Sequence, residues 1–356
     1  MYANHSKNTF IEQSLIEIWS HALYVDTVSL TDNFFNIGGD SLSALIVIDQ
    51  IKQRLGWEIS LGDFVRYPTI LDLVSNRSQP HAAIIDKSII RMSVKGGQTP
   101  CIFIHPVGGL IFAYSKLVKN LGNNRSCYGI QSLAIAGLEV PKSIEQMAEV
   151  YSDLIYNQLS IEEFNIIGWS SGGIIAFEIA RIAAAKKLNL QKIVLIDSYV
   201  WKDSFQKLSE KETLRDFYTD LTFQISPQNI EVANKFFDTP QQIFHELSEI
   251  LFGRVSELKE DYSRIEFIKR MYEAYRWNVH ALSHYQATPA NVSCLLLHDI
   301  ENNTVDLWKE LSKNEFISQP IPCGHYGLLE DQYSFLISEK IRAYIEPSVD
   351  NQSNKW

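Results

Sequence analysis

The chain has 356 residues, of which 46% are apolar and 21% are charged, and its formal net charge is -10 at pH 7. This length suits two or three domains with ample material for a core. The acidic balance argues against nucleic acid or an anionic membrane as the main partner, because no basic stripe offsets it. No apolar run is long enough for a membrane span, and residues 1–10 lack the charged and apolar regions of a secretory signal.

The cysteine and histidine residues limit which metal sites and disulfides the chain can form. Cys101, Cys127, Cys294 and Cys323 are far apart, and no two of them form a CxxC pair. The first three lie at or in apolar, strand-like runs, which favours buried free thiols over disulfides or a metal site. None of the nine histidines belongs to an HExxH motif. We therefore expect a cytoplasmic protein without a metal centre.

The first 75 residues or so are predicted to be helical. Residues 9–23 repeat apolar groups at helical spacing, and a second helix is expected from Ser41 to about Leu55. Residues 61–74 add a turn and a short helix that is broken near Pro68. These elements predict a small all-α bundle with its own core.

Ser41 stands at the start of the second helix, after two glycines and Asp40. A phosphate ester on Ser41 would meet free backbone N–H groups and the positive end of the helix dipole. Alternatively, Asp40 or Ser41 simply caps the helix, as these residue types commonly do. Helix chemistry alone leaves both interpretations open.

Residues 32–42 around this serine read Asp-Asn-Phe-Phe-Asn-Ile-Gly-Gly-Asp-Ser-Leu. This stretch resembles the attachment motif of the peptidyl carrier domains of non-ribosomal peptide synthetases. The double glycine and the paired phenylalanines look more like a peptidyl carrier than a polyketide or fatty-acid carrier. The resemblance covers residues 8–77 and implies a 4'-phosphopantetheine on Ser41, added by a phosphopantetheinyl transferase. A helix cap can coexist with this role.

A polar stretch containing Pro80 predicts a linker over residues 78–83. Beyond it, short β-branched runs alternate with helices over residues 84–346, followed by a tail at 347–356. This alternation predicts a mostly parallel sheet with helices on both faces. We expect strands at 84–94, 101–105, 127–131, 164–168, 192–197, 292–298 and 316–319, and helices at 110–121, 144–159, 171–187 and 332–344.

A polar, helical and aromatic-rich insertion interrupts the alternation over residues 199–290. Its last helix, expected near 261–285, has apolar residues at spacings of three and four. An insertion of this size above a sheet is typical of a lid over a site. We expect each of its aromatic residues to pack inside the insertion, and none is named as a substrate contact.

The strand at 164–168 leads into Gly168-Trp169-Ser170-Ser171-Gly172 and then into a helix. Such a strand, turn and helix is typical of a sharp corner that lifts a serine hydroxyl clear of the sheet, with glycines that let the backbone turn. An ordinary glycine-rich turn would have the same pattern. The residues available as partners of Ser170 therefore decide its interpretation.

A serine nucleophile needs a base, and the base needs a group that orients it. In this type of fold the order along the chain is serine, then an acid, then histidine. Asp197 ends the strand after that of Ser170, and Asp299 ends a later strand; either could also cap the turn that follows it. The best base is His325, in a glycine-flanked loop after the last strand. Poorer candidates are His280, His284 and His298.

An acyl-transfer site also needs N–H donors for the oxyanion. One donor is expected from Ser171, directly after the nucleophile. The other is expected from the loop after the strand at 101–105, which reads His105-Pro106-Val107-Gly108-Gly109.

Residues 84–346 as a whole resemble the type I thioesterase domain of a peptide synthetase, which has an α/β hydrolase fold. These domains usually carry the acid one strand earlier than most α/β hydrolases, so the resemblance favours Asp197 over Asp299. It also assigns the second oxyanion donor to the N–H of Val107. His105 matches a family position but is interpreted as loop-shaping, and Ser171 replaces a bulkier apolar residue, which leaves the pocket shape open.

The two resemblances together imply the releasing end of a non-ribosomal peptide assembly line, with condensation and adenylation domains upstream and a product such as an antibiotic or siderophore. Ser41 would hold a peptidyl thioester, and Ser170 would take over the chain and release it by hydrolysis or cyclisation. The start at Met1 suggests a segment of a longer synthetase or a short stand-alone protein. Two alternatives stay open: a stand-alone or editing thioesterase or esterase acting on other carriers, and a non-catalytic carrier or docking module.

Overall fold

The computed structural model describes residues 2–346 with gaps at 24, 40, 58, 60–62, 65–66, 77–87, 94–95, 123, 136–137, 187, 201–207, 226–238, 253–261 and 328–330. The linker expected at 78–83 and the tail expected at 347–356 therefore lie outside the described residues. Within the described ranges, no helix combines the length and the apolar character that crossing a membrane requires.

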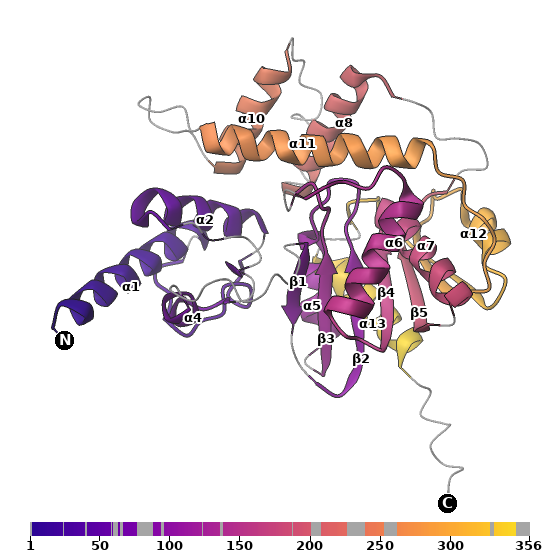
Figure 1. The fold of residues 1–356 in the computed structure, drawn as a ribbon, viewed down its shortest axis with the longest axis horizontal. Helices are drawn as coiled ribbons and strands as arrows, with labels where there is room; N and C mark the ends of the chain where they lie inside the picture. Colours follow the sequence, from indigo (N-terminus) through magenta and orange to yellow (C-terminus); the bar gives the residue numbers. More distant parts are fainter. Residues whose placement is uncertain are drawn as a thin grey trace, which may run out of the picture.

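The described helices of the N-terminal bundle are α1 (Tyr2–Leu23), α2 (Ser41–Leu55) and α4 (Ile70–Ser75), and the bundle lies beside the β1 edge of the sheet (Figure 1). Its core is aromatic: the ring of Phe34 lies edge-on to Trp19 and to Phe64, with centroids 4.9 Å apart in both pairs. The helix α1 begins before residue 9, because apolar periodicity marks only the part of a helix that packs.

Seven strands form one sheet in the order β1-β3-β2-β4-β5-β6-β7. Only β1 runs antiparallel, against β3, so the mostly parallel sheet predicted from the sequence is confirmed. The strands are β1 (Ile89–Ser93), β2 (Gln98–Ile104), β3 (Arg125–Ile130), β4 (Glu163–Trp169), β5 (Asn189–Ile196), β6 (Cys294–Asp299) and β7 (Phe316–Ile321).

Both faces of the sheet are buried under helices, because side chains alternate along each strand. In β2, Ile102 and Ile104 join the core under α6 and α7, whereas Cys101 and Phe103 join the core under α5 and α13. The covering elements are η1 (Phe112–Tyr114), α5 (Ser115–Leu121), α6 (Ile144–Asp153), η2 (Leu154–Gln158), α7 (Ser171–Lys186), α12 (Val305–Leu311) and α13 (Asp331–Ile345).

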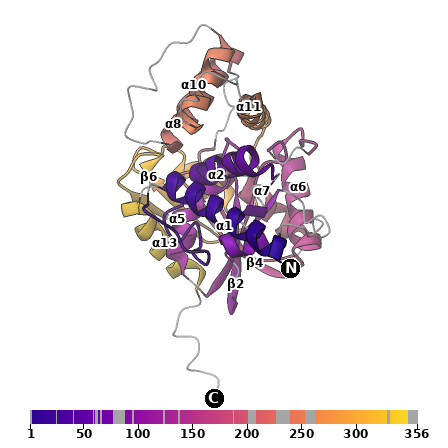
Figure 2. The same cartoon turned by 90° about the vertical axis from the view of Figure 1, so that its left-hand side faces the viewer.

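The described residues of the insertion include three helices, α8 (Glu210–Ile225), α10 (Pro240–Phe252) and α11 (Tyr262–Ser283), called the lid helices below, which lie above the sheet in both views (Figures 1 and 2). Phe217, Tyr218 and Phe244 are buried in one cluster with the apolar residues of α11, which confirms the packing role expected for them. Nothing is described for the side chains of Phe205, Phe223, Phe236, Phe237 and Phe252.

Candidate active site

Ser170 occupies a strained corner between β4 and α7. Its φ angle is 57°, a left-handed conformation that residues with a side chain rarely adopt. The corner is held by two backbone hydrogen bonds, from Ser170 N–H to Ile196 O (2.9 Å) and from Gly173 N–H to Ser170 O (3.1 Å). A Cβ on Gly172 would come within 2.5 Å of the Ile104 carbonyl oxygen, so glycine is required there. The corner thus holds Ser170 partly exposed at the end of a buried strand.

The structure brings Ser170, His325 and Asp197 together in one hydrogen-bonded chain. His325 Nδ1 lies 2.6 Å from Asp197 Oδ2, and His325 Nε2 lies 3.1 Å from Ser170 Oγ. Because a carboxylate only accepts, Nδ1 carries the proton and Nε2 is left to accept from the serine hydroxyl. The imidazole also stacks on Trp169, with ring centroids 5.0 Å apart. This geometry suits proton transfer from the hydroxyl to Nε2.

Asp197 is fully buried, yet its surroundings favour the charged form. Its second oxygen accepts the Asp299 N–H and the Asn302 side-chain amide, each at 3.0 Å. Burial alone would raise the pKa of Asp197, but the hydrogen bonds from His325 and Asn302, the charge of His325 and the Asp299 N–H together lower the pKa below its usual value. The carboxylate is therefore ionised and able to orient the imidazole.

Asp299, the rival acid, has a different part in the structure. Its carboxylate accepts the Glu301 N–H at 2.9 Å, which makes a local turn, and its own N–H supports Asp197. The neighbouring His298 donates Nδ1–H to the Asp299 carbonyl and accepts from Ser318. The other histidines considered, His280 and His284, lie at the end of α11 in the lid.

The loop after β2 is shaped by His105. Its Nδ1–H donates to the Pro106 carbonyl (2.8 Å), and its Nε2 accepts the Tyr151 hydroxyl (2.7 Å). Burial lowers the pKa of His105 to about 4, so the ring is neutral at pH 7. Gly109, with φ of 83°, closes the loop. These contacts agree with the loop-shaping role expected for His105, and they place Val107 in a fixed turn near the end of β2.

Tyr114 joins this loop to the serine corner, a role that the sequence did not reveal. Its hydroxyl donates to the Ile104 carbonyl and accepts the Trp169 N–H, both at 2.7 Å. Burial raises the pKa of this hydroxyl, which therefore keeps its proton. Tyr114 thus links Ile104, the residue before His105, to Trp169, the residue before Ser170.

Two lid residues also contact the loops of the site. The Asn278 amide on α11 donates to the Val107 carbonyl at 2.8 Å. The Tyr326 hydroxyl, next to His325, donates to Asp220 on α8, also at 2.8 Å. No local sequence pattern marks these pairs, because 171 and 106 residues separate their members.

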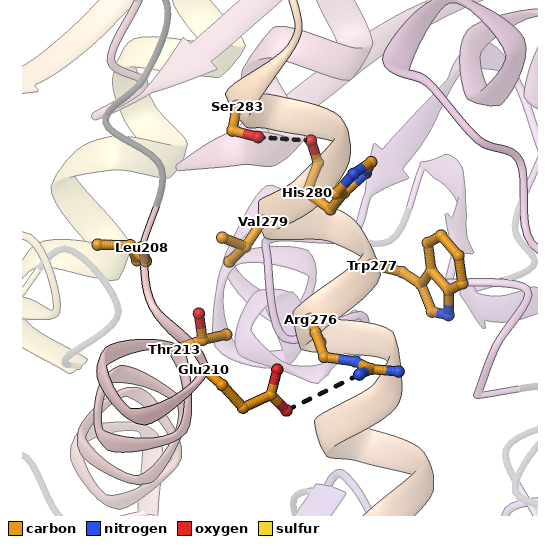
Figure 3. A pocket seen from close by; sticks show the side chains of 8 residues that line it. All are labelled: Leu208, Glu210, Thr213, Arg276, Trp277, Val279, His280 and Ser283. Atoms are coloured by element: carbon orange, nitrogen blue, oxygen red, sulfur yellow. Dashed lines mark hydrogen bonds and ion pairs between the residues drawn. The ribbon is translucent and has the colours of Figure 1, made fainter.

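A hollow of about 330 Å³ lies between the start of α8 and the end of α11 (Figure 3). An ion pair of 3.8 Å joins Arg276 and Glu210 at its wall. The residues that line it are Leu208, Glu210, Thr213, Arg276, Trp277, Val279, His280 and Ser283. Its lining includes none of Ser170, Asp197 and His325, so we do not count it as part of the candidate active site.

The expected attachment serine is the first residue of α2, although its side chain and the whole of Asp40 lie outside the described residues. A helix that begins at Ser41 directs the free N–H groups of its first turn toward a group on that residue. Gly38 is exposed with φ of 107°, and a Cβ on Gly39 would overlap the ring of Phe34. The helix start and the compact loop therefore fit a phosphate ester at Ser41.

Comparison with known proteins assigns both parts of the chain. The model of the thioesterase domain family matches residues 99–344, and that of the phosphopantetheine attachment site matches residues 13–75. The first match covers well over half of the chain, so the chain belongs to the thioesterase domain family. It is a carrier–thioesterase didomain: the N-terminal bundle is a phosphopantetheine attachment domain, and the α/β hydrolase part is a thioesterase of the serine hydrolase type.

The curated relatives are large peptide synthetases. The chain is 28% identical over 189 residues to the dimodular nonribosomal peptide synthase of Bacillus subtilis (strain 168), a match that covers 53% of this chain and 8% of the relative. It is 23% identical over 334 residues to the probable non-canonical nonribosomal peptide synthetase CymA of Salinispora arenicola (strain CNS-205), covering 89% of this chain and 4% of that protein. The chain thus spans less than a tenth of the length of these relatives.

Solved structures support the fold. The four-domain nonribosomal peptide synthetase holo-AB3403 is similar with a TM-score of 0.63 and 24% identity, over 95% of this chain and 26% of that one. The Vlm2 thioesterase domain is similar with a TM-score of 0.55 and 14% identity, over 73% of this chain and 98% of that one. At these identities the likeness concerns the fold alone.

Proposed function

We propose that this didomain releases the finished chain of a non-ribosomal peptide assembly line. Ser41 would hold the 4'-phosphopantetheine, which supplies a thiol that carries the peptide as a thioester. Ser170, His325 and Asp197 would form the catalytic triad, with the N–H groups of Val107 and Ser171 as oxyanion donors. The hydrogen-bonded chain from Ser170 to Asp197, on a strained corner in the same polypeptide as the carrier domain, is the observation that carries the proposal.

The steps follow from the protonation states of the site. His325 Nε2 accepts the proton of Ser170 as Oγ attacks the thioester carbonyl, and the N–H donors stabilise the oxyanion. The C–S bond then breaks, His325 gives its proton to the leaving sulfur, and the peptide is left as an ester on Ser170. Water, or an amine or hydroxyl of the peptide itself, attacks this ester with His325 as base, which releases the free acid or a cyclic product.

The strained serine and the lid support an acyl-enzyme site, whereas the carrier domain supports a tethered substrate. A tether raises the local concentration of the thioester around the triad, so free-substrate affinity matters less than carrier docking. We therefore expect upstream condensation and adenylation domains and a phosphopantetheinyl transferase as partners. The four buried free cysteines favour a reducing compartment, which for this step would be the cytoplasm.

We also propose domain boundaries at 8–77 for the carrier and at 84–346 for the thioesterase, with residues 78–83 as linker. The family matches at 13–75 and 99–344 fall inside these bounds. The lid is proposed to extend over about residues 199–290, and the described helices α8, α10 and α11 lie within it.

A loading experiment tests the proposal. A transferase attaches a peptidyl-pantetheinyl arm to the protein, and intact mass spectrometry follows the acyl group with time. The wild type should lose the acyl group within minutes, whereas Ser170→Ala should retain it, because no hydroxyl is left to take it over. The product mass distinguishes the free acid from a cyclic product, which is lighter by one water.

A Ser41→Ala protein is the matched control, since it should accept no arm while still hydrolysing a small soluble thioester. Release of the acyl group from the Ser170→Ala protein at the wild-type rate would overturn the assignment of the nucleophile. A wild type that holds its cargo and is inert to a serine-reactive phosphonate would favour a non-catalytic carrier module instead.

A further inference from the structure

Among the described residues, a largely buried ion pair joins the carrier bundle to the lid. The guanidinium of Arg264 on α11 donates from Nε and Nη2 to Asp49 Oδ2 on α2, at 2.9 and 2.6 Å. The two side chains are only 9% and 11% exposed, although 215 residues separate them along the chain. Gln53 on α2 donates to the same oxygen at 3.0 Å. The pair thus joins two domains rather than stabilising one helix.

The burial of this pair distinguishes it from the other ion pairs of α11. Lys269 and Glu266 on the same helix are 49% and 64% exposed and lie 4.0 Å apart. Exposed pairs of that kind contribute little, because water screens both charges. A largely buried pair has larger consequences, because little water screens the interaction between its two charges.

A second contact lies on the loop before Ser41. The two phenylalanines of the attachment motif have separate roles: Phe34 is fully buried in the carrier core, whereas Phe35 is half-buried. Phe35 packs both against the carrier core and against the cluster under α5 and α13 in the thioesterase. The loop that leads to the attachment serine therefore touches the hydrolase body while α2 touches the lid.

Both figures show the same arrangement, with α2 lying under the end of the lid formed by α10 and α11 (Figures 1 and 2). Asp49 lies eight residues after the start of α2, which is about 12 Å along the helix axis. The contact therefore lies about two helical turns away from the attachment position.

We propose that Asp49 and Arg264 form the docking contact through which the lid receives the carrier of the same chain. This inference rests on the proposed release function and adds to it the surface that admits the carrier. It implies that the lid selects its carrier by charge: a carrier with a basic residue at the position of Asp49 would be rejected by Arg264.

Charge reversal in single-turnover transfer tests the contact. Arg264→Glu should slow transfer of an acyl group from Ser41 to Ser170 about tenfold or more, because two carboxylates would face each other at a desolvated interface. The double variant Asp49→Arg with Arg264→Glu should recover most of the rate. Hydrolysis of a small soluble thioester should stay within twofold of the wild type in all these proteins, since it needs no carrier. Lys269→Glu, the same charge change on an exposed part of α11, should leave both rates unchanged.

A second readout does not depend on turnover. In the Ser41→Ala protein, ¹⁵N relaxation of the carrier amides reports whether the bundle tumbles with the thioesterase. Arg264→Glu should shorten the correlation time of the carrier, and the double reversal should restore it. If transfer and tumbling are unchanged in Arg264→Glu while the wild type releases its cargo normally, the docking contact is overturned but the release function is not. Failure of the wild type to release any cargo would instead count against the function on which the contact rests.

Discussion

The two oxygens of Asp197 face different partners, and this division determines what a substitution would do. Oδ2 accepts from His325, whereas Oδ1 accepts from the Asp299 N–H and the Asn302 amide. In Asp197→Asn, these two donors would hold the amide oxygen on their side. The amide NH₂ would then face His325 Nδ1 and donate to it, which moves the ring proton to Nε2, where it blocks acceptance of the Ser170 proton.

We therefore expect Asp197→Asn to lower kcat about 10³- to 10⁴-fold, the loss known for a triad with the wrong histidine tautomer. The measurement is hydrolysis of a small soluble thioester, with a thermal melt to show that the variant folds. Asp299→Asn is the matched control: its side-chain oxygen can still accept the Glu301 N–H, so kcat should stay within about tenfold. A larger loss in Asp299→Asn than in Asp197→Asn would contradict the assignment of the acid.

Single residues outside the triad show the limit of sequence reasoning. The apolar runs of β4 and β5 predict where these strands end, and so place Ser170 and Asp197 at one edge of a parallel sheet. Tyr114 and Asn302 belong to no motif, and their contacts depend on how distant segments pack. The sequence held one weak indication that Asn302 lies near the site: it follows Asp299, which ends a strand at the same edge of the sheet as Asp197.

At the scale of elements, the lid helices contact two loops of the site, the loop of Val107 and the loop of His325. Through Asn278, α11 holds the carbonyl of Val107, and Ala274 of the same helix lies against Gly109, where an added Cβ would approach it to 3.4 Å. Through Asp220, α8 holds Tyr326 beside His325. The lid helices are thus part of the support of the site.

This support predicts a positioning role for Asn278. Loss of its amide in Asn278→Ala would let the loop of Val107 shift, and a small misplacement of an oxyanion donor is costly in the transition state but not in substrate binding. We expect kcat for a small thioester to fall about ten- to hundredfold with KM within about twofold. Trp277→Ala, the exposed neighbour on α11, should leave both constants nearly unchanged. A rise in KM at constant kcat in Asn278→Ala would argue for a binding role instead.

The helical elements were predicted unevenly, for physical reasons. The run from Ser41 to Leu55 has strong periodicity and a clear start, and α2 has those bounds. The helix expected over 144–159 ends as α6 at Asp153 and continues as the π-helical turn η2, because periodicity does not distinguish these backbone forms. The short helix α12 was not expected, since seven residues give too few repeats of an apolar pattern.

At the scale of the whole molecule, the two domains have separate cores. The carrier core gathers around Trp19, Phe34 and Phe64, and the thioesterase cores lie on the two faces of the sheet. The described contacts between the domains include one ion pair and the ring of Phe35, and neither of these joins the two cores into one. Domains with separate cores commonly unfold as separate units. We therefore expect two transitions in urea, with the larger m-value for the thioesterase, which exposes more surface.

The pH dependence of these transitions shows which of them belongs to the thioesterase, because His105 is buried in that domain. Its pKa is about 4 in the folded chain against an ordinary value of 6.5, so between these values the unfolded chain binds more protons. The stability contributed by neutral His105 is therefore complete above pH 6.5 and is lost as the pH falls toward 4. From pH 7 to 5 the free energy of unfolding in the thioesterase transition should fall by about 2 kcal/mol on this account.

The control variant is His105→Asn, whose side chain keeps a donor for the Pro106 carbonyl but does not titrate. Its thioesterase transition should therefore depend less on pH, and the carrier transition of the same protein is the internal reference. Equal pH slopes in the wild type and His105→Asn would contradict the buried neutral ring.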